Sequence, residues 1–176
     1  MEFMELITER RSVRAYKEQA VDRSLIDEVI RAAQLAPSWK NSQTGRYYVA
    51  QSPEAQARIR ACLPIYNQKS SSHAALIVTA YEKDVSGFAA GEPVNELGNE
   101  WGAYDLGLQN MLLTLRAREL GLDTLIMGIR DGDAIRAAAG IPESQAVFSV
   151  IALGYRDQEP AARPRKAPEE IVAYLA

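Results

Sequence analysis

Apolar and polar positions alternate along the chain with the periods of helices and strands. From residue 22 to 36 the apolar side chains recur at the spacing of one helical face, at Leu25, Ile26, Val29, Ile30 and Ala33. Asp22 or Ser24 can cap the start of this helix. Pro37 ends it, because the residue before a proline avoids the α region. The stretch therefore predicts an amphipathic helix on the surface of a core.

Four further stretches have the composition of strands. Residues 74–81, AALIVTAY, form a continuous apolar run, which is typical of a strand covered on both faces. The other three strands are expected at residues 46–51, 122–127 and 146–155. Two shorter helices lie among them. One covers residues 52–63, with Ser52 as N-cap and Pro53 at the first helical position, and the other begins after Asp131.

A longer helix is expected over residues 96–120. Apolar residues occur around most of its circumference, which predicts burial on nearly all sides. Gly98, Gly102 and Gly107 each cost about 1 kcal/mol relative to alanine inside a helix, so another backbone is expected to approach closely there. In so small a domain, a second subunit can supply that neighbour. Gly121 then provides the left-handed residue that ends the helix.

The chain has 176 residues, enough for one domain with a real core, and we expect a single domain over 1–176. Helices and strands follow one another without regular βα alternation, and neither GxGxxG nor GxxxxGK occurs. This order favours a three-layer α+β fold with a sheet of about four or five strands. Residues 84–97 contain glycines and a proline and predict a mobile loop or lid. Residues 157–176 predict a proline-broken tail that ends in one helical turn or more.

Composition narrows the classes of function. A hydrophobic fraction of 47% and a charged fraction of 24% are typical of a soluble globular protein. A net charge of −3 and a pI near 5.3 argue against a nucleic-acid partner, which requires a broad excess of lysine and arginine. No apolar run reaches the roughly 18 to 20 residues of a membrane helix. The first residues are acidic, unlike a signal peptide. We therefore expect a cytoplasmic protein with no membrane partner.

Single copies of histidine and cysteine limit the chemistry of the side chains. His73 is the only histidine, which removes most metal sites and the triads that depend on histidine. Cys62 is the only cysteine, so neither an internal disulfide nor a thiolate metal cluster can form. We expect no metal, and we expect a cofactor to carry any chemistry.

Two basic clusters stand out in this slightly acidic chain. The first surrounds one hydroxyl near the N-terminus, at Arg10, Arg11, Ser12 and Arg14. The second lies in the tail, at Arg163, Arg165 and Lys166. The planar fork of arginine can donate two parallel hydrogen bonds to one anion. If the tail folds back beside the first cluster, the two form one pocket for a phosphate monoester. The alternative is ordinary solvated surface charge.

The stretch APSWKNSQTGRYYV, residues 36–49, joins the first helix to a strand through a polar turn. Asn41 and Gln43 each carry a donor and an acceptor, which suits the edge of a flat heterocycle. Pro37, Ser38 and Trp39 could supply a rigid wall. The alternative is an ordinary connection made of turn-forming residues.

Four blocks taken together resemble the nitroreductase family of FMN-dependent oxidoreductases. They are RRSVRAY, APSWKNSQTGRYYV, WGAYDLGLQNMLLTLRARELGLDTLIMG, and IALGYRD followed by ARPRKAPEEIV. The blocks occur in the family's order and span nearly the whole chain. The resemblance implies a mostly antiparallel central sheet flanked by helices. It also implies a homodimer with the long helix buried at its interface and two FMN molecules bound between the subunits.

The resemblance also implies roles for individual residues. The phosphate and ribityl chain of FMN would be held by Arg10, Arg11, Ser12 and Arg14, with Arg165 and Arg163 joining from the tail. The flavin would be approached from the partner subunit by Pro37, Ser38, Trp39, Asn41 and Gln43. Asn67 would face the ring or the ribityl chain, and the backbone amides of Met127 and Gly128 would approach flavin N5 and O4. Ser70 stands where some relatives carry a lysine.

The implied mechanism is ping-pong. NADH or NADPH would pass hydride to flavin N5, and a flat organic acceptor, such as a nitroaromatic or a quinone, would then take its place. FMN would supply the electron chemistry, so no catalytic side chain is named. Two alternatives remain open. One is a narrower flavin enzyme of the same fold, such as a dehydrogenase, a dehalogenase or a flavin-handling protein. The other is a non-enzymatic binder of a phosphorylated ligand.

Overall fold

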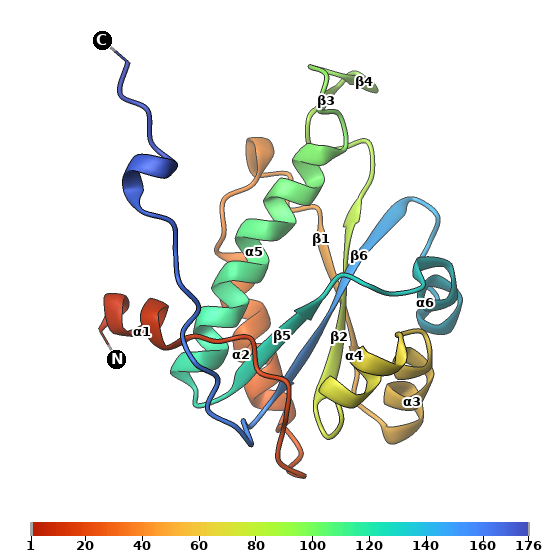
Figure 1. Ribbon diagram of the computed structural model, residues 1–176. Coiled ribbons are helices and arrows are strands. Elements are labelled where there is room, and N and C mark those ends of the chain that lie inside the picture. Colours follow the sequence, from red (N-terminus) through yellow and green to blue (C-terminus); the bar gives the residue numbers. More distant parts are fainter. Residues whose placement is uncertain (1, 176) are drawn as a thin grey trace.

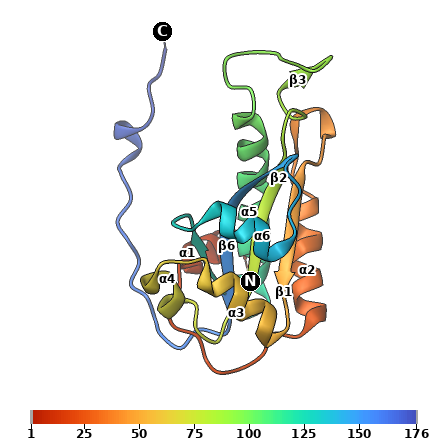
Figure 2. The ribbon, with the colours of Figure 1, turned by 90° about the vertical axis from the view of Figure 1, so that its right-hand side faces the viewer.

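A four-stranded antiparallel sheet lies between two layers of helices (Figures 1 and 2). The computed structural model describes residues 2–175. The strand order is β1-β2-β6-β5, formed by β1 (Gly45–Ala50), β2 (Ala75–Glu82), β6 (Gln145–Gly154) and β5 (Asp123–Met127). The predicted three-layer α+β fold and its antiparallel sheet are confirmed.

The helices divide between the two faces of the sheet. On one face lie α2 (Arg23–Gln34) and α5 (Glu100–Glu119). On the other lie α3 (Pro53–Ala61), α4 (Ile65–Ser70) and α6 (Gly132–Ala139), as Figure 2 shows. The predicted caps are present: Ser52 accepts a hydrogen bond from the Ala55 amide, and Asp131 accepts one from the Ala134 amide. Each cap satisfies an amide that the first turn of a helix leaves unpaired.

The central position of strand β2, between two layers of helices, explains why its sequence is a continuous apolar run. Alternate residues of a strand point to opposite faces of the sheet. Leu76 and Val78 belong to the core under α3 and α6, whereas Ala75 and Ile77 belong to the core under α2 and α5. Both faces of β2 are therefore covered by helices, as expected from the sequence.

The N-terminal segment and the start of the tail both lie at the β5 edge of the sheet. Helix α1 (Phe3–Glu9) leads into an extended segment whose Val13 amide donates to the Thr124 carbonyl at 3.0 Å. The tail leaves the end of β6 and runs away from the body of the molecule (Figure 1), with one short turn, η2 (Pro168–Glu170). The sequence did not predict α1 or α4, because helices of seven and six residues carry too few turns to show a period.

The expected start of the long helix is wrong. α5 begins at Glu100 and not at residue 96. Gly98 lies before it at a φ of 46°, and the Asn95 side chain accepts hydrogen bonds from the Leu97 amide and the Trp101 indole, so the chain turns there. Within one chain part of the helix surface stays open, because Tyr104 is 60% exposed and Met111 is 41% exposed. Burial of this surface by a second subunit stays a prediction.

The glycines of α5 are also explained differently. A Cβ on Gly102 would lie 2.5 Å from Cδ2 of Tyr81, so a side chain and not another backbone makes the close approach. A Cβ on Gly107 would meet nothing within 4 Å in the described chain. Gly121, at a φ of 79°, follows the end of the helix in the left-handed conformation, as predicted.

Residues 84–97 form a small hairpin beside the N-terminal end of α5, made of β3 (Phe88–Ala89) and β4 (Glu92–Pro93). Asp84 and Asn99 tie its base to the helix: the Asp84 amide donates to Asn99 Oδ1 at 2.7 Å, and Asn99 Nδ2 donates to Asp84 Oδ1 at 2.8 Å. Its role as a lid stays a prediction. Over the described residues, none of the helices combines the length and apolarity needed to span a membrane.

Candidate functional site

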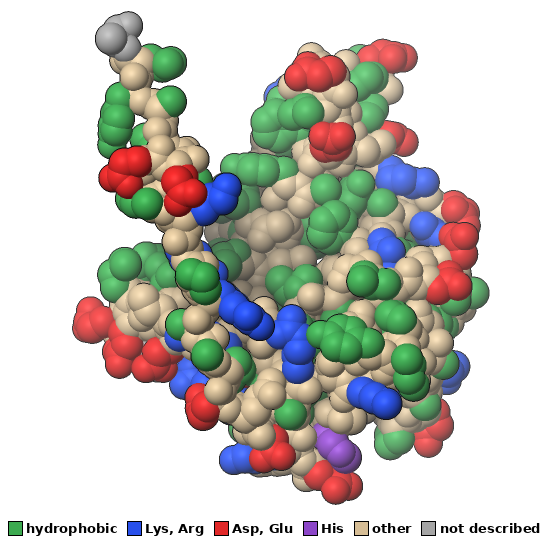
Figure 3. Space-filling model, viewed as in Figure 1, with side chains coloured by type: hydrophobic (Ala, Val, Ile, Leu, Met, Phe, Trp, Pro, Cys, Tyr) green, Lys and Arg blue, Asp and Glu red, His purple; other side chains and the backbone are tan. Residues whose placement is uncertain are grey.

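A cavity of about 1160 Å³ opens between the N-terminal segment, the tail and α5. Figure 3 shows Lys and Arg side chains gathered at the base of a hollow between the tail and the body. The predicted residues that line the cavity are Arg10, Arg11, Ser12, Arg14, Arg163 and Arg165. The structure thus brings together basic residues that lie about 150 positions apart in the sequence. We call this space the arginine cavity.

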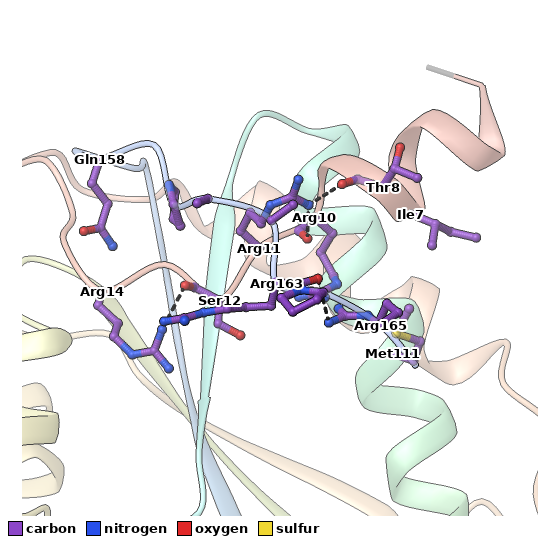
Figure 4. A pocket seen from close by; sticks show the side chains of 14 residues that line it. Ile7, Thr8, Arg10, Arg11, Ser12, Arg14, Met111, Gln158, Arg163 and Arg165 are labelled. Carbon is purple, nitrogen blue, oxygen red and sulfur yellow. Dashed lines mark hydrogen bonds between the residues drawn. The ribbon is translucent and has the colours of Figure 1, made fainter. Parts of the chain in front are cut away.

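The arginines of this cavity differ in how fully their donors are used (Figure 4). Arg11 donates to the carbonyls of Thr8 and Arg10 at the end of α1. Arg14 donates from Nε to the Tyr66 hydroxyl at 2.9 Å, and from Nη1 to the Ser12 carbonyl at 3.2 Å. These two guanidinium groups are therefore partly occupied by the protein itself.

Three other guanidinium groups keep most of their donors free. Arg165 makes one long hydrogen bond, from Nη1 to the Arg163 carbonyl at 3.4 Å. Within residues 2–175, the side chains of Arg10 and Arg163 donate no hydrogen bond and form no ion pair. Free guanidinium forks that line one cavity are the arrangement that binds a phosphate group.

The electrostatics of Arg10 point the same way. Partial burial lowers the pKa of its guanidinium, and the nearby positive charges of Arg165 and Arg11 lower the pKa further. Like charges held close together favour whatever neutralises them. An anion between Arg10 and Arg165 would remove this repulsion.

A smaller cavity of about 260 Å³ adjoins the first and leads along β5. Arg10, Ser12 and Met111 line both cavities, and Thr124 and Ile126 extend the smaller one along the strand. Its far end therefore lies next to the segment that contains Met127 and Gly128. Met127 is buried and Gly128 is exposed.

Gly128 and Asn67 have different surroundings. A Cβ on Gly128 would meet nothing within 4 Å in the described chain, so any close approach that glycine permits must come from another molecule. Asn67 is buried, and its Nδ2 donates to the Ile129 carbonyl at 2.9 Å. Its amide therefore holds the segment that follows β5, and it does not line either arginine-containing cavity.

The structure does not bring residues 37–43 to the arginine cavity. They form a loop around the short helix η1 (Trp39–Asn41), beside the N-terminal half of α5. Asn41 and Gln43 adopt positive φ values of 57° and 50°, which non-glycine residues rarely adopt. The Gln43 amide donates to Ser38 Oγ at 3.0 Å, which helps to hold this conformation. We call this segment the amide loop.

Asp105 anchors the amide loop, and sequence reasoning missed it. This buried carboxylate on α5 accepts from the Trp39 amide at 3.0 Å and from Ser86 Oγ at 2.7 Å, both at Oδ2. The Trp39 ring lies against Trp101, with ring centroids 4.8 Å apart. An aspartate inside an otherwise apolar helical stretch was the signal that could have revealed the anchor, because a buried carboxylate needs partners.

Among residues 2–175, no three or more His, Cys, Asp or Glu side chains are grouped so that they could hold a metal ion. The fold and the cavity instead define a class: an α+β protein with an arginine-lined cavity between its N-terminal segment and its tail.

Comparison with known proteins gives the family. The model of the nitroreductase family matches residues 7–83 and 66–155. The chain belongs to the nitroreductase family.

Two curated relatives and one solved structure illustrate the similarity. A Stutzerimonas stutzeri protein, provisionally named NADH dehydrogenase/NAD(P)H nitroreductase, is 30% identical over 86% of this chain and 84% of its own. The 4-nitrobenzoate reductase of Pseudomonas putida is 26% identical over 97% of this chain and 92% of its own. A protein of Exiguobacterium sibiricum, solved in complex with FMN, has a TM-score of 0.87, is 22% identical, and covers 99% of this chain and 98% of its own. The last comparison shows a shared fold.

Proposed function

We propose that the chain is an FMN-dependent oxidoreductase that uses NADH or NADPH to reduce a flat organic acceptor, such as a nitroaromatic or a quinone. The observation that carries the proposal is the arginine cavity, where free guanidinium forks from both ends of the chain converge. The names of the relatives support the reductant and the class of acceptor. The FMN complex of a protein with the same fold supports the cofactor.

The cavity fits the cofactor in charge, size and shape. Its volume of about 1160 Å³ is ample for a mononucleotide. The repulsion between Arg10 and Arg165 is relieved by a phosphate dianion. The smaller cavity along β5 then offers a path for the ribityl chain toward Met127 and Gly128.

In this proposal the protein binds and orients, and it contributes no nucleophile. Arg10, Arg163 and Arg165 hold the phosphate, and Ser12 and Arg14 lie beside them in the wall of the cavity. When bound, FMN supplies the hydride chemistry between the nicotinamide and the acceptor. The amides near Gly128 lie at an exposed strand end, where they can donate to a flat ring.

The functional unit in this proposal is a homodimer. Tyr104, Gly107 and Met111 form an exposed stripe along α5, and Ile126 and Ile129 are exposed at the β5 edge nearby. A second copy would cover this apolar surface and would bring the amide loop of the partner subunit to the flavin. This accounts for the separation of the two predicted groups of residues within one chain.

A narrower flavin enzyme is the second candidate. The observation that favours it is the cluster of aromatic rings beside the hairpin of residues 84–97, in which Trp101 lies between Trp39 and Tyr104, with centroids 4.8 and 5.8 Å away. Such rings would select the shape of a stacking acceptor. Dehydrogenation, reductive dehalogenation and flavin handling are the reactions to compare.

The test is anaerobic reduction of the purified protein after reconstitution with FMN. We expect a yellow protein whose visible flavin absorbance bleaches with NADH or NADPH and recovers on addition of a nitroaromatic or a quinone. Recovery with one acceptor class alone would favour the narrower enzyme. A colourless protein that does not retain FMN would contradict the proposal and favour a non-enzymatic binder of a phosphorylated ligand.

A further inference from the structure

The buried carboxylate of Asp123 is the centre of an ion network outside the proposed cofactor contacts. Its side chain is 1% exposed. Arg156 binds it with both arms of the guanidinium fork, from Nη2 to Oδ1 at 2.6 Å and from Nε to Oδ2 at 2.7 Å. Arg118 donates from Nη1 to Oδ2 at 3.3 Å. Two-point binding by arginine fixes the relative orientation of the two groups as well as their distance.

The network reaches both segments that line the arginine cavity. Arg118 continues to Glu9, with Nη2 and Oε2 3.2 Å apart, and Glu9 directly precedes Arg10. Arg156 continues to Glu159, with Nη1 and Oε2 2.7 Å apart, at the start of the tail that carries Arg163. The buried Asp123 carboxylate is therefore connected through Arg118 to the N-terminal segment and through Arg156 to the start of the tail.

Backbone hydrogen bonds bring the same two segments together near Arg156. The Lys17 amide donates to the Tyr155 carbonyl at 2.9 Å, and the Asp157 amide donates to the Ala15 carbonyl at 2.9 Å. Tyr16 forms an isolated bridge with Arg156 and packs closely over Gly154, where a Cβ would lie 2.9 Å from its ring. The network thus lies where the N-terminal segment and the tail both leave the sheet.

The arginines of this region are of two kinds, those paired with carboxylates of the network and those left unpaired beside the cavity. Arg118 and Arg156 are paired with carboxylates, and the hydrogen bonds that Arg156 donates to Asp123 raise the pKa of the Arg156 guanidinium. Their charge is neutralised locally, so they add little field to the cavity. Arg10 and Arg165 stay unpaired with carboxylates in the described chain and face the open space.

We propose that Asp123 is a positioning residue of the anion site: it holds the N-terminal segment and the tail at the separation at which their free arginines bind one phosphate. The proposal rests on the proposed function, because the phosphate is taken to be that of FMN. It assigns Asp123 no contact with the cofactor. Its action passes through Arg118 and Arg156.

Comparing FMN with riboflavin tests this role, because the two ligands differ by the phosphate alone. The dissociation constant of each is measured for the wild-type protein and for Asp123→Asn, which keeps the size of the side chain and removes its charge. We expect the preference for FMN over riboflavin to fall at least tenfold in the variant, while riboflavin binding changes little. A matched control is Ile135→Ala, which opens the core under α6 and lowers stability while it keeps every charged group of the network. This control should leave the ratio unchanged.

A second variant covers the case in which Asp123→Asn does not fold. Arg156→Lys keeps one positive charge next to Asp123 and loses the two-point contact, so it should fold and lower the FMN preference by a smaller factor. An unchanged preference in the folded variants would overturn the role of Asp123. If the wild-type protein itself shows no preference for FMN over riboflavin, the proposed phosphate site fails. The two failures are therefore distinguishable.

Discussion

The amide loop lies beside the N-terminal half of α5, whereas the arginine cavity meets this helix at Met111 near its middle, and the two regions are built in contrasting ways. In the cavity, the guanidinium groups of Arg10 and Arg163 are left without hydrogen-bond partners from the described chain. In the amide loop, Asp105 and Ser38 satisfy backbone amides and hold a strained conformation. The first region is charged and incomplete, and the second is shaped and internally anchored.

This contrast teaches which part of the site a single chain can build. An uncompensated group of guanidinium groups favours the binding of an anion. A loop held at positive φ values has a conformational cost that a further contact can offset. The indole Nε1 of Trp39 is buried and lacks a hydrogen-bond partner within residues 2–175. A partner subunit or a ligand would supply the contact that this loop lacks. We therefore expect the two regions to meet only in the homodimer.

The largest expected effect comes from mixing two inactive variants. Arg10→Ala impairs the cavity, and Asn41→Ala impairs the amide loop, so each homodimer should have little activity. If every flavin site draws on two chains, random mixing gives heterodimers with one intact site, and roughly a quarter of wild-type activity should return. Activity is measured after co-refolding or co-expression with two affinity tags. No recovery in verified heterodimers would show that each site lies within one chain.

The next largest effect concerns the exposed stripe of α5. Tyr104→Asp places a charge on an apolar surface, and burying an unpaired charge or losing a tyrosine contact should weaken dimerisation by about a hundredfold or more. Sedimentation over a dilution series measures this, and FMN should be lost together with the dimer. Ala137→Asp, at an exposed position of α6 on the opposite face of the sheet, is the control and should leave the dimer intact.

Single arginines of the cavity should have an intermediate effect. Arg10→Ala or Arg165→Ala removes a charge-assisted hydrogen bond to phosphate and should weaken FMN binding by about 1.5 to 3 kcal/mol each. Fluorescence titration of FMN measures the change, and riboflavin affinity should barely move. Arg58→Ala, an exposed arginine of α3, is the matched control. Equal FMN affinity in all three variants would contradict the cavity as the phosphate site.

The smallest effect distinguishes charge from hydrogen bonding at Asp105. Asp105→Ala leaves the Trp39 amide and Ser86 Oγ without their acceptor and should lower the free energy of unfolding by about 1 to 3 kcal/mol. Asp105→Asn can keep one acceptor oxygen at the position of Oδ2, so it should lose less. Denaturant unfolding measures both. If the two variants are equally stable, the hydrogen bonds from Trp39 and Ser86 do not hold the loop.

Much of the fold could be predicted because its signals are local. The period of residues 22–36 predicted α2, and the continuous apolar run predicted the doubly covered strand β2. Ser52 and Asp131 marked helix starts, because their side chains accept hydrogen bonds from amides of the first turn. Gly121 marked a helix end, because it adopts the left-handed conformation. The errors arose where a short or turn-rich stretch had no period, as at α1, α4 and the start of α5.

The sequence by itself determined the types of the longer elements, their boundaries to within a few residues, and the residue types able to bind an anion. Only the tertiary structure decided that Arg10 and Arg165 face one cavity, that Asp105 and Asp123 anchor distant segments, and that one face of α5 stays uncovered. The physical reason is that periodicity and capping act between neighbours in the chain. Convergence of charges and coverage of a helix face depend on contacts between residues far apart in sequence, which no local pattern records.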